Sequence, residues 1–194
     1  IAPEFVTIVD SGLESANRGA LAVDDAGTPG RRTVLVENGV LVSYLHDRIS
    51  AKHYGVERTG NGRREDFRSP PIPRMRVTFI EPGPHGPDEI VGSVRKGLYA
   101  IDFSNGEVNI GAGDYSFYVK TGFLIEDGKL TSPVKDVNLI GNGPDSLGKV
   151  DMVGGDFELD GGTWTCGKDG QGVPVGLGLP TISVAAITVG GVRS

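Results

Sequence analysis

One cysteine carries the sharpest chemical signal in this sequence of 194 residues. Cys166 lies in the segment TCGKDGQGVPVGLGLPT, where glycines on both sides let the backbone approach another group closely. A cysteine thiolate is both a nucleophile and a metal ligand, and Lys168 would favour the thiolate if the two side chains approach. The alternative is a small buried side chain that takes no part in chemistry.

Three histidines are the available partners for such a cysteine. Catalysis by cysteine needs a histidine, and the spacing singles out none of His46, His53 and His85. His46 and His53 are seven residues apart, which is further along a helix than the i, i+4 pair that binds metals. His85 lies in a Pro/Gly loop, which predicts a solvated side chain. The histidines therefore give little support for a zinc site made from this chain alone.

The segment TGNGRRE is the second candidate for chemistry. A tight turn at Asn61-Gly62 would present Arg63 and Arg64, and Glu65 could pair with one of them. Arginine binds a carboxylate through two parallel hydrogen bonds, so this loop could hold a peptide terminus or an acidic side chain. The alternative is a surface loop whose charges pair with one another.

Three aspartates, Asp145, Asp156 and Asp160, lie in the segments GNGPD and MVGGDFELDGG. Their carboxylates could bind a cation, but their spacing is not that of an EF-hand loop, so we interpret them as turn residues. The phosphate-binding patterns also fail, because GLGLPT is not a P-loop and no strand–GxGxxG–helix unit is present.

The composition predicts short strands and many turns. The chain has 31 Gly and 12 Pro, which interrupt helices before they can propagate. Asn38-Gly39 and Asp127-Gly128 separate apolar runs and predict two β-hairpins. Further strands are expected at residues 5–9, 107–113 and 115–126, and in KDVNLIG and PTISVAAITVGG.

Only residues 46–54 and 87–100 have helical patterns; in the second, Ile90, Val94 and Leu98 follow at i, i+4 and i+8. We expect one α+β domain over residues 1–194, mainly antiparallel sheet in an open, barrel-like arrangement with a few short helices.

The charge and the apolar runs of the sequence limit the classes of partner and the compartment. With 25 Asp+Glu against 19 Lys+Arg, the net charge of −6 argues against nucleic acid as a direct partner. The densest basic group is Arg63, Arg64, Arg68, Arg74 and Arg76. No apolar run reaches 18 residues, so no membrane span is expected. A single cysteine fits a reducing compartment, the cytoplasm. The start IAPEF is not a signal peptide and lacks an initiator Met, which suggests a piece of a longer chain.

Several segments taken together resemble a known family. They are VDDAGTPG, VENGVL, TGNGRRE, PIPRM, GLYAIDF, LIEDGKLTSPVKDVNLIGNGP, TCGKDGQGVPVGLGLPT and the closing ITVGG. In this order they resemble the TldD branch of the TldD/PmbA family, whose members are also described as modulators of DNA gyrase. The resemblance covers nearly the whole chain and corresponds to the C-terminal domain of that family.

The resemblance implies a zinc metalloprotease. In TldD-like proteins an HExxxH helix supplies two histidine ligands and a glutamate base, and the cysteine of the CGKxGQ motif, here Cys166, supplies the third ligand. Two imidazoles and one thiolate leave a fourth position for water, whose pKa zinc lowers to about 7. Lys168 and Gln171 match the motif, and the candidate substrate-binding residues are Asn61, Arg63, Arg64, Lys168 and Gln171.

The sequence departs from the family in one respect, because it contains no HExxxH. In the family that helix precedes the point where this chain begins, so its absence fits truncation. We therefore expect one zinc ion in the full-length protein, and a fragment that is inactive and holds no zinc by itself. A natural relative without catalytic activity is the weaker alternative, since such relatives usually lack the cysteine motif.

The resemblance also implies partners. Family members work as dimers, so a homodimer or a heterodimer with a TldE (PmbA)-like subunit is expected. The implied substrates are peptides, such as the leader of a modified peptide antibiotic or the antidote of a gyrase-directed toxin. The gyrase name would then describe a phenotype. The alternative is a noncatalytic dimerisation or assembly domain in which Cys166 is buried and inert.

Overall fold

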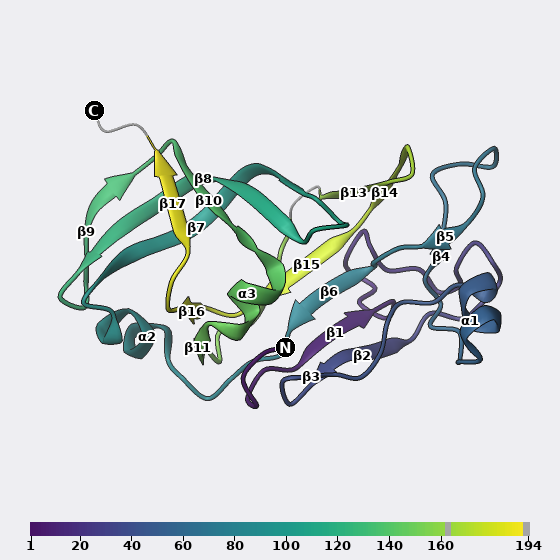
Figure 1. Cartoon of the computed structure of the whole chain (residues 1–194), viewed down its shortest axis with the longest axis horizontal. Coiled ribbons are helices and arrows are strands. Elements are labelled where there is room, and N and C mark those ends of the chain that lie inside the picture. Colours follow the sequence, from purple (N-terminus) through teal and green to yellow (C-terminus); the bar gives the residue numbers. More distant parts are fainter. Residues whose placement is uncertain (162–163, 192–194) are drawn as a thin grey trace. The chain divides into compact units, whose positions relative to one another are not determined.

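The computed structural model describes residues 1–161 and 164–191 (Figure 1). The chain forms two compact units. The first, here the thiol unit, comprises Glu4–Glu81 and Phe157–Pro180. The second, here the hairpin unit, comprises Ile1–Pro3, Pro82–Asp156 and Thr181–Ser194. The cysteine and all five candidate substrate-binding residues belong to the thiol unit.

A six-stranded sheet is the largest element of the thiol unit. Its strand order is β12-β15-β6-β1-β2-β3, and every pair is antiparallel except β15 with β6. Its strands are β1 Ile8–Ser11, β2 Arg32–Glu37, β3 Val40–Leu41, β6 Val77–Ile80, β12 Glu158–Leu159 and β15 Gly176–Leu179. Val9 and Val77 are fully buried, because β-branched side chains pack well on a pleated surface.

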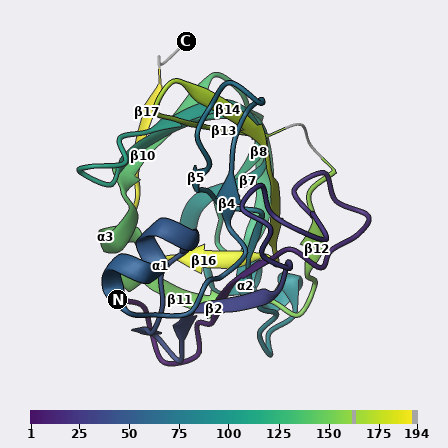
Figure 2. The same ribbon diagram turned by 90° about the vertical axis from the view of Figure 1, so that its right-hand side faces the viewer.

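Two smaller antiparallel ribbons complete the strands of the thiol unit, and both are visible in Figure 2. One pairs β4 (Gly62–Arg63) with β5 (Ile72–Pro73). The other pairs β13 (Thr165–Lys168) with β14 (Gln171–Pro174), and it carries Cys166.

The single helix described in the thiol unit is α1, Arg48–Tyr54. The Asp47 carboxylate accepts a hydrogen bond from the Ser50 backbone N–H at 2.7 Å, and the Ser50 hydroxyl contacts the Asp47 N–H in return. This capping box satisfies donors that a helix start leaves unpaired. Gly55 ends the helix in the left-handed conformation. The prediction of a helix over residues 46–54 is confirmed, with its start at Arg48.

The hairpin unit is built on long antiparallel strands. Its main sheet has the order β17-β10-β8-β7, and β9 also pairs with β8. The strands are β7 Lys96–Val108, β8 Asp114–Glu126, β9 Lys129–Val134, β10 Val137–Asn142 and β17 Thr188–Gly191, with a second pair β11 Val150–Val153 and β16 Ile182–Val184. The helices are α2 Pro87–Ser93 and α3 Gly143–Gly148. Val119 and Val153 are fully buried in this unit.

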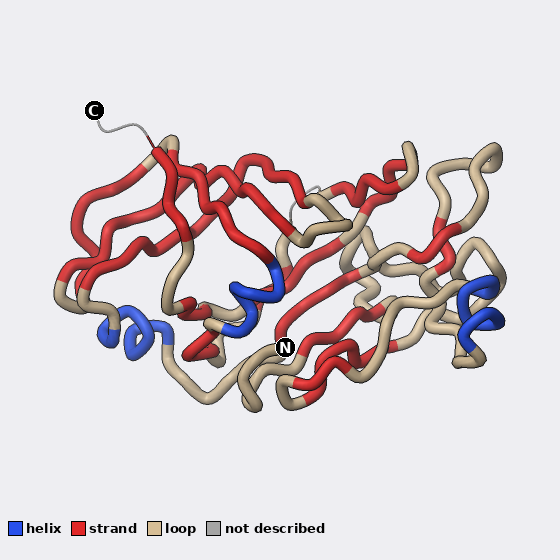
Figure 3. The backbone as a smooth tube through the Cα atoms, in the orientation of Figure 1, coloured by secondary structure: helices blue, strands red, loops and turns tan. Residues whose placement is uncertain are grey.

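Both predicted hairpin turns are confirmed. Asn38-Gly39 joins β2 to β3 and Asp127-Gly128 joins β8 to β9, and all four residues have positive φ. Figure 3 shows the predominance of strands over three short helices in the described residues. The α+β prediction is therefore confirmed, and the described sheets are open, with no closed barrel.

Two predicted elements end early in the structure, and one helix was not predicted. The helix predicted over 87–100 ends at Ser93, and residues from Lys96 onward pair with β8 instead, because a long strand partner outweighs a weak helical period. The strand predicted over 107–113 ends at Val108, before a turn. The helix α3 was not predicted, although Pro144 and Asp145 at its start are ordinary signals of a helix N-terminus.

Within residues 1–161 and 164–191, every helix is too short or too polar to cross a membrane.

Two neighbouring glycines in the hairpin unit should respond oppositely to alanine. Gly128 has φ +74°, and a Cβ there would lie 2.7 Å from the Gly92 carbonyl oxygen, so Gly128→Ala should lower the free energy of unfolding by about 1–3 kcal/mol. Gly92 lies in α2 with open space around its Cβ position, so Gly92→Ala should raise it by about 0.5–1 kcal/mol. Urea unfolding of both variants measures this, and equal losses would contradict it.

Candidate functional site

Cys166 lies on a tight hairpin of the thiol unit. Strands β13 and β14 meet at Asp169-Gly170, where both residues have positive φ, and Lys168 pairs with Gln171 across the turn. Such two-residue turns favour Asp-Gly because their backbone twist matches that of the strands. Asp169-Gly170 is the same signal as the predicted Asp127-Gly128 turn, although no hairpin was predicted at this position. The hairpin therefore gives the thiol a regular backbone rather than a loose glycine-rich loop.

One face of the hairpin carries the thiol and its neighbouring side chains. Cys166 pairs with Val173, and residues that pair across an antiparallel ribbon point to the same face. Cys166, Lys168, Gln171 and Val173 thus share one face. Val173 is almost fully buried, whereas Cys166 is a half-buried free thiol. On this face, Val173 and Gln171 are buried in the thiol unit, whereas Cys166 and Lys168 remain partly exposed to solvent.

Hydrogen bonds from two arginines hold the hairpin. The Arg74 Nη2 donates to the carbonyl oxygens of Cys166 and Gln171, the second at 3.1 Å. The Arg63 Nη2 donates to the Pro174 carbonyl at 2.6 Å, and its Nη1 donates to the Met75 carbonyl at 2.7 Å. Both arginines are only 2% exposed. They act as connections between main-chain segments rather than as surface charges.

The side chains of Gln171 and Lys168 add three more contacts. Gln171 accepts a hydrogen bond from the Glu65 N–H and donates to the Pro70 carbonyl, both at 3.2 Å. The Lys168 Nζ donates to the Pro73 carbonyl at 3.3 Å. The hairpin is thereby joined to the segment that contains the TGNGRRE loop.

A buried carboxylate organises the polar groups next to these arginines. Asp10 is 1% exposed and accepts hydrogen bonds from Asn61 Nδ2 at 2.7 Å, from the Arg76 N–H at 2.8 Å and from the Thr78 hydroxyl at 2.8 Å. Burial raises the pKa of Asp10, because it disfavours the charged form more than these donors stabilise it. Burial and the nearby charge of Arg76 lower the pKa of Arg63 to about 10, so Arg63 remains a cation at neutral pH.

Arg76 explains two glycines of the thiol unit. A Cβ on Gly12 would lie 2.0 Å from the Arg76 Nη1, and one on Gly30 would lie 2.5 Å from the same atom. Arg76 is completely buried, so it has little room to move away. Only glycine at both positions lets the guanidinium occupy this space.

The structure separates the predicted substrate-binding residues into two groups. Asn61, Arg63 and Gln171 are buried, and their side chains bond to the chain itself. Arg64 and Lys168 are half-buried, and the Arg64 Nε lies 3.6 Å from Asp25 rather than beside Glu65. Contact of these five residues with a substrate stays a prediction. Arg74 and Asp10 are new members of the site, because no local signal distinguishes them from other charged residues.

The described residues do not assemble a complete metal site. Residues 1–161 and 164–191 contain no group of three or more His, Cys, Asp or Glu side chains that could hold a metal ion. His46 lies beside Ser50, and His53 packs edge-on against Tyr54 in α1. His85 belongs to the hairpin unit, where its Nδ1 lies 3.0 Å from Glu89. Within these residues, Cys166 would supply one zinc ligand at most.

The three aspartates considered as cation ligands have local partners. Asp145 lies 2.6 Å from Lys149, Asp156 accepts hydrogen bonds from Thr181, and Asp160 accepts one from Trp164. Asp145 lies in the first turn of α3, so its interpretation as a turn residue was wrong, whereas Asp156 and Asp160 lie outside the helices and strands.

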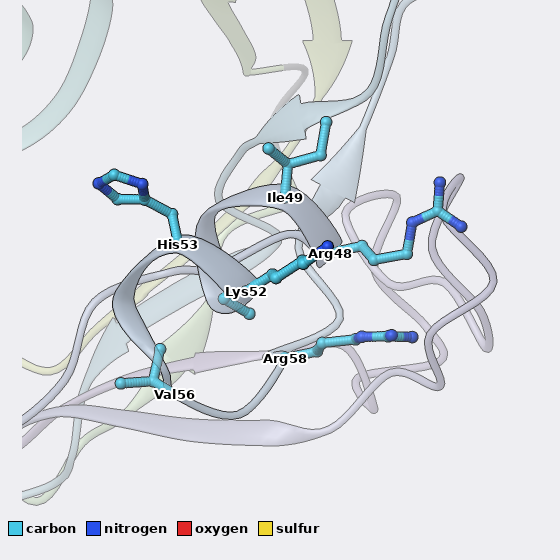
Figure 4. A pocket seen from close by; sticks show the side chains of 7 residues that line it. Arg48, Ile49, Lys52, His53, Val56 and Arg58 are labelled. Carbon is cyan, nitrogen blue, oxygen red and sulfur yellow. The ribbon is translucent and has the colours of Figure 1, made fainter.

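A separate hollow of about 870 Å³ lies beside α1. Figure 4 shows the side chains on its wall, which are basic or apolar, and the lining residues are Arg48, Ile49, Ala51, Lys52, His53, Val56 and Arg58. None of the predicted substrate-binding residues lines this hollow.

Comparison with known proteins identifies the family of this chain. Residues 1–191 match the family described as the PmbA/TldA metallopeptidase C-terminal domain. This chain belongs to that family. It is similar to the metalloprotease TldD homolog of Buchnera aphidicola subsp. Acyrthosiphon pisum, with 44% identity over 98% of this chain and 40% of the relative. The zinc metalloprotease TldD homolog of Saccharolobus solfataricus is 30% identical over 98% of this chain and 43% of its own length.

Solved structures agree with this membership of the PmbA/TldA family. A Thermotoga maritima protein solved as a candidate modulator of a DNA gyrase has a TM-score of 0.77 and 25% identity, over 97% of this chain and 40% of that one. TldE from Thermococcus kodakarensis has a TM-score of 0.69 and 25% identity, over 95% of this chain and 40% of that one. The chain spans about two fifths of the length of these relatives.

Asp10 should give the folded protein a recognisable pH dependence. Because burial raises its pKa above the 3.8 of an ordinary aspartate, the folded chain keeps this proton to a higher pH than the unfolded chain does. Its contribution to stability is therefore complete below pH 3.8 and is lost as the pH rises through the folded pKa. The unfolding free energy of the wild type minus that of Asp10→Asn should fall over this range.

Asp66→Asn is the matched control, because a hydrogen bond from Arg68 lowers the pKa of this exposed carboxyl. The same difference should rise with pH for Asp66, over the range below 3.8. Chemical denaturation at a series of pH values measures both. A difference that rises with pH for Asp10 would contradict the prediction.

Proposed function

We propose that the full-length protein is a TldD-like zinc-dependent metallopeptidase that acts on peptides, and that this domain contributes Cys166 as one metal ligand. The observation that carries the proposal is a half-buried free thiol on an anchored hairpin, in a chain of the PmbA/TldA family. Thiolate sulfur is a preferred ligand of zinc, and one TldD homolog is named a zinc metalloprotease.

The remaining ligands would come from outside these 194 residues. The described residues offer no further cluster of ligands, and the chain spans about two fifths of its relatives. A thiolate without imidazole partners loses most of the chelate, so the 194 residues alone would be inactive and without zinc. We place the protein in the cytoplasm, where a free thiol stays reduced.

An extended peptide is the proposed substrate. Strands β13 and β14 pair with each other, and the sheet pairings of the described residues include no third strand beside them. The outer edge of a two-stranded ribbon can pair with an extended chain through main-chain hydrogen bonds. A peptide bound there would lie next to Cys166. In this arrangement Arg64 and Lys168 are the half-buried cations available to contact substrate, and Asn61, Arg63 and Gln171 support them.

The ligand role predicts the behaviour of Cys166→Ala in the full-length protein. The variant should lose zinc and peptidase activity and keep its fold, because alanine removes a ligand and fits the space of a half-buried cysteine. Elemental analysis should find one zinc per wild-type chain, and none in the variant or in the 194-residue piece. Peptide cleavage and circular dichroism complete the measurement.

Thr165→Ala is the matched control for this variant, because Thr165 is the exposed neighbour of Cys166 on β13. It should keep both zinc and activity. Stoichiometric zinc with full activity in Cys166→Ala would refute the ligand role.

The second candidate function is a noncatalytic assembly domain that pairs with a TldE-like subunit or with a second copy. Two observations favour it: TldE itself is a structural neighbour, and the hairpin of β7 and β8 exposes Ile101, Val108 and Ile110. Under this proposal the oligomer depends on the apolar surface and not on the thiol.

This candidate predicts a dimer whose stability responds to charge on β7. Val108→Lys should shift light-scattering mass toward the monomer, because an interface core excludes unpaired charge. Cys166→Ala should leave the mass unchanged. A monomeric wild type, both alone and mixed with a TldE-like protein, would contradict it.

A further inference from the structure

We infer that Arg74 is the positioning residue for Cys166: it fixes both strands of the thiol-bearing hairpin through one guanidinium group. The inference deepens the proposed function and rests on it, since it assigns how the metal-ligating thiol would be held. Arg74 follows β5 directly and is 2% exposed.

The hydrogen bonds of Arg74 reach the main chain of Cys166 directly. Its Nη2 reaches the carbonyl of Cys166 in β13 and the carbonyl of Gln171 in β14. One of the two acceptors is thus the main chain of the candidate ligand itself, and the other lies on the opposite strand, next to the turn. A single donor group therefore restrains the distance between the strands and the position of the cysteine backbone.

The arginine is itself held from the core. The Arg74 N–H donates to the Asn61 carbonyl at 2.9 Å, and Asn61 Nδ2 donates back to the Arg74 carbonyl at 3.0 Å. Asn61 Nδ2 also donates to Asp10 on β1, at 2.7 Å. A continuous series of buried hydrogen bonds therefore runs from a central strand of the six-stranded sheet to Cys166.

The hairpin needs such support. An isolated two-stranded ribbon is marginally stable in water, and β13 and β14 form a two-stranded sheet. A metal ligand must be held within about 0.5 Å of its productive position, and groups that orient ligands typically contribute 10–100-fold in metal affinity. Arg63 holds Pro174, which pairs with Thr165 at the open end of the hairpin, whereas Arg74 holds the carbonyl of Cys166 itself and that of Gln171 beside the turn.

Lysine should replace Arg74 poorly. A guanidinium presents several donors in a fixed plane, whereas an ammonium is a point charge on a flexible stem. Arg74→Lys keeps the buried charge and loses the fixed geometry, and Arg74→Gln loses both. Arg68→Gln is the matched control, because Arg68 is an exposed arginine that bonds to Asp66 two residues away.

The test uses the full-length protein and three measurements. The first is the dissociation constant for Zn²⁺, obtained by competition with a chelator. The second is the rate at which iodoacetamide alkylates Cys166 in the zinc-free protein. The third is hydrogen exchange of the backbone at residues 165–174. The two readouts without metal report the position of the hairpin even if no peptidase activity is found.

Arg74→Gln should bind Zn²⁺ about 10–100-fold more weakly, alkylate faster and exchange faster at residues 165–174. Arg74→Lys should fall between Arg74→Gln and the wild type, and Arg68→Gln should match the wild type. Equal zinc affinity, alkylation and exchange in Arg74→Gln and the wild type would overturn the inference. If Arg74→Gln does not fold, Arg74→Lys decides by the same criteria.

Cys166→Ala separates this inference from the proposed function. If Cys166→Ala loses zinc and Arg74→Gln is unchanged in all three measurements, only the positioning role fails. If Cys166→Ala keeps zinc, the ligand role fails, and faster alkylation and exchange in Arg74→Gln still support positioning of the hairpin.

Discussion

The Asp10 carboxylate is the group on which the polar interior of the thiol unit depends. It lies on β1, between β2 and β6, and accepts hydrogen bonds from Asn61, Arg76 and Thr78. Burial of a carboxylate costs several kcal/mol unless hydrogen-bond donors surround it. Loss of any of these three partners would therefore lower the free energy of unfolding. The loop around Asn61 and the segment leading into β6 are therefore fixed to the sheet. From Asn61 the same network continues through Arg74 to the hairpin of Cys166.

The thiol unit also buries three arginine side chains, although charged side chains usually lie at the surface. Arg63, Arg74 and Arg76 are each at most 2% exposed. Asp10, Asp24 and Asp25 supply the opposing charges around Arg76. Arg63 and Arg74 use their N–H groups on main-chain carbonyls, so they join loops that have few apolar side chains of their own. Segments rich in Gly and Pro obtain a fixed position from these hydrogen bonds, in addition to the burial of Val173 and Val175.

This construction fits a domain that supplies one part of a larger site. The described residues offer one candidate zinc ligand, and the ligand sits on a hairpin tied to a preformed sheet. Under the proposed function, a thiol held in this way would need little reorganisation on binding zinc, so little of the binding free energy would be spent on ordering the hairpin. The chain spans about 40% of the Buchnera aphidicola relative, and under the proposed function the remaining ligands would come from outside these 194 residues.

The sequence by itself determined the features that depend on local chemistry. The Asn38-Gly39 and Asp127-Gly128 turns, the helix near residues 48–54 and the α+β class follow from backbone preferences that act over a few residues. The CGKDGQ motif indicated the family and singled out Cys166.

Only the tertiary structure decided what the charged residues do. The sequence presented Arg63 and Asn61 as groups exposed on a loop, whereas both are buried in contacts with distant segments. It gave Arg74 no role, because its partner, the carbonyl of Cys166, lies 92 residues further along the chain. The strand from Lys96 likewise replaced a predicted helix because β8 lies beside it. Local propensity depends on residues close in sequence, so it cannot predict a hydrogen-bond or strand-pairing partner that only the folded chain brings close.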